Sequence, residues 1–305
     1  MIQELKEKKI RDWCLFDFGI SSYPTLIITF IYGAFYAKEI AQSPEIGTSN
    51  WGFAISIGSA LSFLLFLTVF FQGKVKNTKI PMTFFKSFFY LLIFTVSSLF
   101  FFDNNSNQFF PLIFIGLSLV CFEVINFFYN LSLHTVAKKE KRGMVSNLGW
   151  ALGYLGGLIS LALVFVILNF SKDKNYEIFG ESVFLFIGPF VGFWTFFFGI
   201  KHIAKFRNKF FVIENLKNFF LILKKTNTHK FFISYFFFNN SVICIFSFAS
   251  MFASFLYGLE EDQILILGIS INLAGIIGCI VLGRIEDRIS SEKVIKICIV
   301  SLLLT

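Results

Sequence analysis

A few acids and amides interrupt the long apolar runs of this sequence, where a charged or hydrogen-bonding side chain is costly. Asn126 and Asn130 follow Glu123 by three and seven positions, which places all three on one face of a helix. A polar face on an apolar helix indicates a bundle interior or a water-filled cavity, although for the amides hydrogen bonding between helices is an equally good interpretation. An acid near the middle of a membrane is either protonated or paired, and for Glu123 we favour a functional role.

The other deep polar side chains are Asp17, Asn239, Asn240 and Asn272. Asp17 follows Trp13, where the first apolar run begins, by four positions, or about 6 Å along a helix. If the helix begins near Trp13, the carboxylate lies close to the lipid headgroups and to the positive end of the helix dipole. Asp17 is therefore either an anchor for the start of the helix or a gate residue at the mouth of a cavity.

Three glycines, Gly149, Gly153 and Gly157, recur every four residues within the stretch NLGWALGYLGGLIS. Small residues at this spacing let two membrane helices approach closely, so they predict a helix-packing face. They do not form a nucleotide-binding loop, because no strand precedes them and their flanks are apolar.

The sequence carries no hydrolase, metalloprotease or phosphate-loop motif. Its three histidines are scattered, and its five cysteines lie in apolar stretches without metal-ligand spacing. We therefore predict that the protein is not an enzyme and uses no metal and no cofactor.

The composition indicates a membrane environment for the helices that carry these residues. The chain has 305 residues, of which 56% are hydrophobic and 15% charged, and its mean hydropathy is +0.73. A soluble domain needs a more polar surface than this. A bilayer crossing takes about 20 apolar residues as a helix, and about nine stretches qualify, the last of them unfinished. The expected spans are residues 13–37, 51–72, 83–102, 110–134, 146–169, 182–200, 231–257, 263–283 and 294–305.

The basic residues indicate which ends of the spans face the cytosol. Almost all of the 27 lysines and arginines lie in the N-terminal tail and in the connections 73–86, 135–145, 201–230 and 284–296, which share one side if the spans alternate. Lysine and arginine mark the cytosolic side of a membrane protein, so we expect the N-terminus in the cytosol. The net charge of +8 then reflects topology, and nucleic acid is not an expected partner.

The longest connection divides the expected spans into two groups. Residues 1–200 are predicted to form a six-helix bundle, residues 201–230 a basic cytosolic linker, and residues 231–305 the start of a second bundle. Within the linker, apolar residues recur at helical spacing in KFFVIENLKNFFLILKK, which predicts an amphipathic helix on the membrane surface. Because the sequence stops inside the ninth span, we expect it to be a fragment of a longer chain.

Four stretches match the patterns of a known family. WCLFDFGISSY resembles its first-helix pattern W-x-x-Y-D-x-x-x-S-x-F, and FFYNLSLHTVAKKEKRGMVSNLGWALGYLGG resembles its stretch F-Y-N-x-x-L-P … R-x-S-x-x-G-W-A-L-G-Y-x-G-G. YFFFNNSV is similar to Y-x-x-Y-x-D-G-V, and GRIEDRISSEK is similar to the loop G-x-x-x-D-R-x-G. The family resembled is that of the vacuole effluxers, a branch of the major facilitator superfamily that includes yeast vacuolar amino-acid effluxers and bacterial relatives.

The resemblance implies a bundle of twelve helices in which the first, fourth, seventh and tenth line a central cavity. It thereby implies a cavity role for Asp17, Glu123, Asn126, Asn130, Asn239 and Asn240. It also implies that the loop after the eighth helix, with Gly283, Asp287 and Arg288, forms a cytosolic gate.

We therefore predict an all-α integral membrane protein of the major facilitator type, a secondary active transporter that works by alternating access. Its expected cargo is a small polar solute such as an amino acid, with Glu123 and Asp17 coupling the movement of the solute to protons. The expected partners are this solute, protons and the lipid bilayer, and the expected form is a monomer in a bacterial inner membrane. The alternative is a non-transporting membrane protein: a sensor, a scaffold or a truncated remnant.

Overall fold

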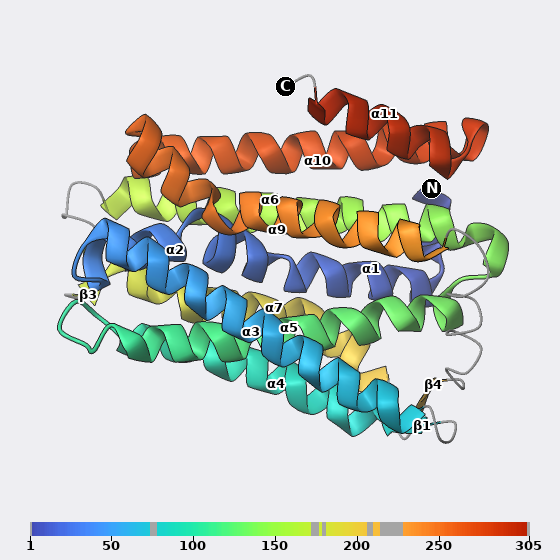
Figure 1. Ribbon diagram of the computed structural model, residues 1–305, viewed down its shortest axis with the longest axis horizontal. Helices are drawn as coiled ribbons and strands as arrows, with labels where there is room; N and C mark the ends of the chain where they lie inside the picture. The colour runs from blue at the N-terminus through green and yellow to red at the C-terminus, as the bar shows by residue number, and fades with distance from the viewer. Residues whose placement is uncertain are drawn as a thin grey trace.

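Long helices lying side by side make up most of the structure, a computed structural model that describes residues 2–73, 78–171, 177–178, 181–205, 210–213 and 228–303 (Figure 1). The α-helices are α1 (Lys8–Ile20), α2 (Tyr32–Phe35), α3 (Pro44–Gly73), α4 (Met82–Ser97), α5 (Phe109–Val136), α6 (Arg142–Ser171), α7 (Ile187–Lys205), α9 (Thr228–Tyr257), α10 (Glu261–Ile289) and α11 (Ser291–Leu303).

Eight helical segments within the described residues are long and apolar enough to cross a membrane. They are Lys8–Ile40, Pro44–Thr68, Met82–Phe101, Phe109–Val136, Lys139–Ser171, Val183–Ala204, Thr228–Tyr257 and Glu261–Glu286. Each overlaps one of the first eight predicted spans, so the prediction of an all-α membrane bundle is confirmed. α11 covers part of the ninth predicted span, and its 13 residues are fewer than the roughly 20 that a crossing needs.

The first span (Lys8–Ile40) is the most buried of the eight. Its most apolar stretch is 78% buried, against 6% for the span formed by α9. It is not one continuous α-helix, because π-helical turns occupy η2 (Tyr23–Phe30) and η3 (Tyr36–Ile40), on either side of α2. The first of these turns contains Pro24, which has no N–H to donate and so interrupts the regular hydrogen-bond ladder.

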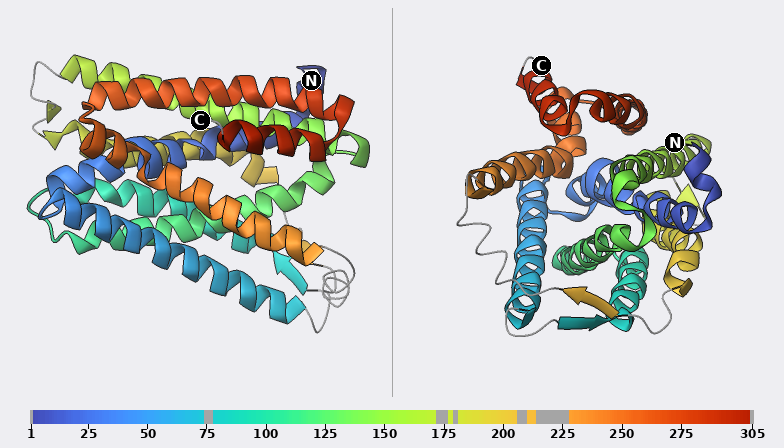
Figure 2. Two further views of the ribbon diagram at one scale, coloured as in Figure 1. Left: turned by 45° about the horizontal axis from the view of Figure 1, so that its top comes forward. Right: turned by 90° about the vertical axis from the view of Figure 1, so that its right-hand side faces the viewer.

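The other spans pack around the first. α1 contacts α6 and α7, α5 contacts α3 and α4, and α10 lies along α6, while α9 crosses the first span and α3 (Figure 2). The core is aromatic: the ring of Phe16 lies 5.5–5.9 Å from those of Phe85, Phe89 and Tyr129. We call the end of the bundle where α1 begins the Lys8 end, and the end where η3 stops the Lys38 end.

Two short antiparallel ladders join loops at the ends of the bundle. β1 (Thr78–Pro81) pairs with β4 (Phe210–Ile213), and β2 (Glu177–Ile178) pairs with β3 (Glu181–Ser182).

β4 corrects part of the prediction for the linker, because the expected amphipathic helix included residues 210–213, which form a strand. The phenylalanine, valine and isoleucine of β4 also favour extended backbone, and β1 supplies a hydrogen-bonding partner that lies far away in the sequence. Residues 214–227, which make up most of the expected helix, lie outside the described residues.

Large apolar side chains cover α9. Phe231, Phe236 and Phe237 are each more than half exposed. The buried residues of α9 all lie in its second half, toward the Lys38 end; they are Ser247, Ser250, Met251, Ala253 and Ser254. An apolar surface of this extent is typical of contact with lipid or with further helices.

Candidate functional site

A row of polar side chains follows one face of the first span into the bundle. Asp17, Ser21 and Thr25 stand four positions apart, so they lie one above another along the helix. Tyr129 on α5 faces the Asp17 end of this row, and Asn272 on α10 lies near the Thr25 end. We call these five residues the polar seam.

Asp17 is the acid of the polar seam. Its Oδ1 accepts a hydrogen bond from the Ser21 hydroxyl at 3.4 Å. The hydroxyl of Tyr129 faces the same carboxyl group, and Tyr154 on α6 and Cys279 on α10 are close enough to interact with its charge. An acid that lies between helices, with hydroxyl groups as its neighbours, can bind a proton or a cationic group.

The three glycines singled out in the sequence all lie where α6 meets the seam. A Cβ atom at any of them would come within 2.5–3.1 Å of two side chains, which are Trp13 and Tyr129 at Gly149, Ser21 and Asp17 at Gly153, and Thr25 and Asn272 at Gly157. The absence of side chains on this face of α6 therefore makes the room that the polar groups occupy.

Gly156 is packed more tightly still. A Cβ atom there would collide with the backbone carbonyl group of Phe18 on α1. This residue is not part of the predicted four-residue repeat, although the pair Gly156–Gly157 in the sequence was a visible sign of close backbone approach.

Trp13 holds Tyr129 in position. The two rings are stacked with their centroids 4.2 Å apart. The indole Nε1 of Trp13 donates to Ser132 Oγ at 3.0 Å and to the carbonyl oxygen of Tyr129 at 3.2 Å. Trp13 is buried. Its contacts hold the part of α5 that carries Tyr129, so that the Tyr129 hydroxyl group faces Asp17.

The structure removes one argument for Asp17 as an anchor of the helix start. α1 begins at Lys8, nine positions or about 13 Å before Asp17, and the effect of the helix dipole falls off within the first turn. The helix-dipole argument for Asp17 as an anchor therefore does not apply, and its role as an anchor or a gate residue stays a prediction. Hydropathy locates the apolar run, but the helix extends beyond it through the charged residues Lys8, Lys9 and Arg11.

Glu123 lies outside the polar seam. It is half-buried on α5, near Tyr23 of the first span, whose hydroxyl is 2.9 Å from Ser118 Oγ. Asn130 is exposed and donates a 3.5 Å hydrogen bond to Asn126, which is half-buried. These residues follow the α5 face expected from the sequence, and this face is only partly buried.

Asn239 and Asn240 lie on the first half of α9, whose side chains are mostly exposed. The side chain of Asn240 donates to the carbonyl oxygen of Phe236 at 2.7 Å, within its own helix. Among the described residues, no hydrogen bond joins either asparagine to the polar seam, and their cavity role stays a prediction.

At the Lys8 end, α6 meets the last turns of α10, which continues to Ile289, so the predicted gate residues lie on a helix and not in a loop. A Cβ atom at Gly283 would lie 2.8 Å from Asn147 Nδ2, and that amide donates to Glu286 at 3.4 Å. Arg288 is exposed, and the side chain of Asp287 lies outside the described residues. At this end of the bundle, the contact between the helices thus includes Asn147, Gly283 and Glu286.

The carboxyl, hydroxyl and amide groups of the polar seam can bind a small polar or cationic group. No group of three or more His, Cys, Asp or Glu side chains that could hold a metal ion occurs in the part of the chain that the structure describes. Asp17 and Asn272 were predicted from the sequence as deep polar residues, whereas Ser21, Thr25 and Tyr129 were not. The four-residue spacing from Asp17 was a sign of the first two, whereas Tyr129 had none.

Comparisons with known proteins agree with this architecture. The family model described as "Vacuole effluxer Atg22 like" matches residues 128–305. The "Uncharacterized MFS-type transporter YxiO" of Bacillus subtilis (strain 168) is 21% identical over 307 residues, which cover 96% of this chain and 71% of that protein. No solved structure matches the chain.

Proposed function

Because the chain belongs to the vacuole effluxer Atg22-like family, we propose that it is a secondary active transporter that moves a small polar solute by alternating access. The name of the Bacillus subtilis relative, an MFS-type transporter, supports the same class of function. The solute proposed is an amino acid or a compound of similar size and polarity.

The polar seam is the observation that carries this proposal. In transporters built from two bundles, the solute binds near the middle of the membrane, between the bundles. Asp17 comes from the first predicted bundle and Asn272 from the second, and both side chains lie against glycines of α6, Asp17 at Gly153 and Asn272 at Gly157. A carboxylate, three hydroxyl groups and an amide would provide acceptors for an ammonium group and donors for a carboxylate.

We also propose an orientation. The N-terminus and the Lys8 end of the bundle face the cytosol, because the basic connections share that side. The membrane is the cell membrane of a bacterium, and the protein acts as a monomer. The Lys38 end then faces the opposite compartment.

Transport is tested with the protein reconstituted into liposomes. The liposomes are loaded with one unlabelled solute at a time. A panel of amino acids, sugars and organic cations is offered outside in radiolabelled form. We expect saturable exchange of at least one small polar solute. A folded protein that moves no member of the panel would contradict the proposal, and binding without movement would indicate the sensor alternative.

Glu123 is the group proposed to couple solute movement to protons, together with Asp17. Replacing Glu123 with glutamine keeps the size of the side chain but removes its ability to titrate. We expect the variant to lose the pH dependence of solute uptake between about pH 5 and 8, because the coupling group no longer changes charge. Uptake is measured across that range in proteoliposomes.

The matched control is Glu140→Gln, which alters an exposed glutamate in the connection before α6. This variant should keep the pH dependence of the unmodified protein. If Glu123→Gln also keeps it, Glu123 does not couple transport to protons.

A further inference from the structure

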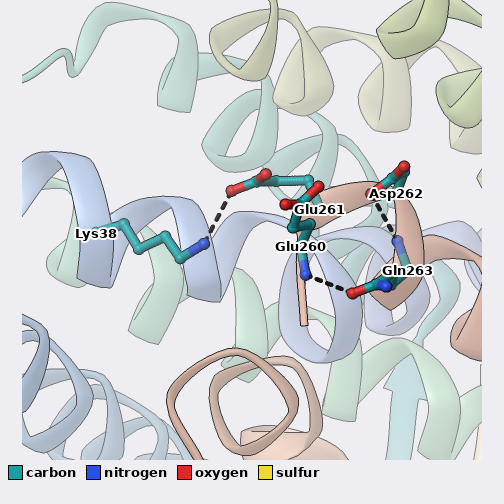
Figure 3. A network of polar contacts seen from close by, with 5 residues as sticks. All are labelled: Lys38, Glu260, Glu261, Asp262 and Gln263. Carbon is teal, nitrogen blue, oxygen red and sulfur yellow. Dashed lines mark hydrogen bonds and ion pairs between the residues drawn. The ribbon is translucent and has the colours of Figure 1, made fainter. Parts of the chain in front are cut away.

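An ion pair connects the first span to the start of α10 at the Lys38 end. Lys38 Nζ lies 2.8 Å from Glu261 Oε1, and the two side chains are 29% and 41% exposed (Figure 3). The partners are 223 positions apart and come from the two sides of the linker at residues 201–230. The pair therefore joins the two parts of the chain that alternating access must separate.

The start of α10 is built to hold Glu261 in place. Glu260 caps the helix, and its backbone N–H donates to the side chain of Gln263 at 3.0 Å in a reciprocal capping box (Figure 3). Glu261 and Asp262 occupy the first turn, where the helix dipole favours negative charge. The position of the carboxylate is thus set by its own helix before it meets Lys38.

The contact beneath the ion pair is incompletely filled. A small, mainly apolar groove of about 40 Å³ lies there, with Phe30, Phe35, Leu168, Phe184, Ile264 and Leu265 among its lining residues. Lys38 and Glu261 also line this groove. The ion pair therefore lies beside a small gap in the packing between the first span, α6 and α10.

The contact between α6 and α10 is of a different kind. A Cβ atom at Gly275 would lie 2.8 Å from the ring of Tyr154, and the contacts at Gly157 and Gly283 are equally close. These positions extend along much of α10, from near the seam to the Lys8 end. A continuous close contact of this kind can act as a pivot. When a bond at one end forms or breaks, the first span and α10 close or separate about this pivot.

We propose that the Lys38–Glu261 ion pair is a latch that holds the Lys38 end of the chain shut. Breaking the pair lets the first span and α10 separate about the contact with α6 and exposes the apolar groove. Its role in a transport cycle rests on the proposed function, whereas the latch itself is a property of the conformations of this chain.

Opening of the groove is measured with a cysteine at Ala34, which lines the groove and is 7% exposed. The full chain carrying Ala34→Cys is placed in nanodiscs and labelled with a charged maleimide. The same protein without Ala34→Cys gives the rate due to its five native cysteines. Lys38→Gln and Glu261→Gln are each expected to raise the labelling rate about two- to fivefold, the range for a partly exposed ion pair.

The double variant Lys38→Glu with Glu261→Lys exchanges the two charges. Its labelling rate distinguishes the loss of the ion pair from other effects of changing these side chains. It should label more slowly than either single reversal, because the ion pair is restored. Lys296→Gln breaks an exposed pair with Glu292 on α11 and should leave the rate unchanged. The latch is refuted if the single neutralisations leave the rate unchanged, if the reversed pair labels as fast as the single reversals, or if Lys296→Gln raises the rate equally. Because no solute is needed, this result stands apart from the transport screen.

Discussion

Replacing Asp17 with asparagine is expected to lower the rate of solute transport about tenfold to hundredfold. Asparagine keeps the volume of the side chain and removes the carboxyl group that accepts from Ser21 and can carry a negative charge. A hydrogen bond to a charged group contributes about 1.5–3 kcal/mol, and each 1.4 kcal/mol is a factor of ten in rate. Initial rates of uptake into proteoliposomes measure the loss.

Asp103→Asn is the matched control for this substitution. Asp103 lies in the connection before α5, outside the spans, where hydrogen bonds from Ser106 and Asn105 hold the pKa of its carboxyl group below the usual value. The substitution therefore removes a real negative charge, yet one remote from the seam, and uptake should remain near that of the unmodified protein. Normal uptake by Asp17→Asn would show that the seam does not bind the solute.

Replacing Gly156 with alanine is expected to destabilise the bundle by about 3 kcal/mol or more. The added methyl group would collide with the backbone of Phe18, and a backbone cannot rotate away as a side chain can. Overpacking a filled interior costs about 1–3 kcal/mol, occasionally more, and here α1 and α6 must move apart. The expected result is a fall of several degrees in the melting temperature of the purified protein, with loss of transport.

Gly143 and Gly278 provide the controls. A Cβ atom at either would meet no other atom within 4 Å. Both lie in helices, where alanine is about 1 kcal/mol more favourable than glycine, so Gly143→Ala and Gly278→Ala should keep or raise the melting temperature. Equal melting temperatures for Gly156→Ala and these controls would mean that α1 and α6 are not in close contact at Phe18.

The membrane bundle could be predicted from the sequence because hydropathy is a local property. A run of about 20 apolar residues needs no knowledge of its neighbours to be recognised as a span. The glycine repeat of α6 was likewise visible, since three glycines four residues apart must share one face of a helix. The position of Asp17 in an apolar run already marked it as unusual.

The sequence predicted less of the linker and of the polar site. At residues 210–213 the helical periodicity was overridden by pairing with residues 78–81, more than a hundred positions away. The polar side chains of α5 and α9 were expected to line one cavity; Asn130 and Asn240 are exposed, and their cavity role stays a prediction. A periodic pattern shows which side chains share a face, but not what that face meets.

The sequence by itself therefore determined that this is a multi-pass membrane protein, where its spans lie and which of their faces carry glycines or polar groups. Only the tertiary structure decided that Asp17 faces Tyr129, that Gly156 meets the backbone of Phe18, and that Lys38 pairs with Glu261. The physical reason is the range of the interactions. Hydropathy and helix formation act over a few turns of the chain, whereas each of these contacts joins residues more than a hundred positions apart, which only the packing of the helices brings together.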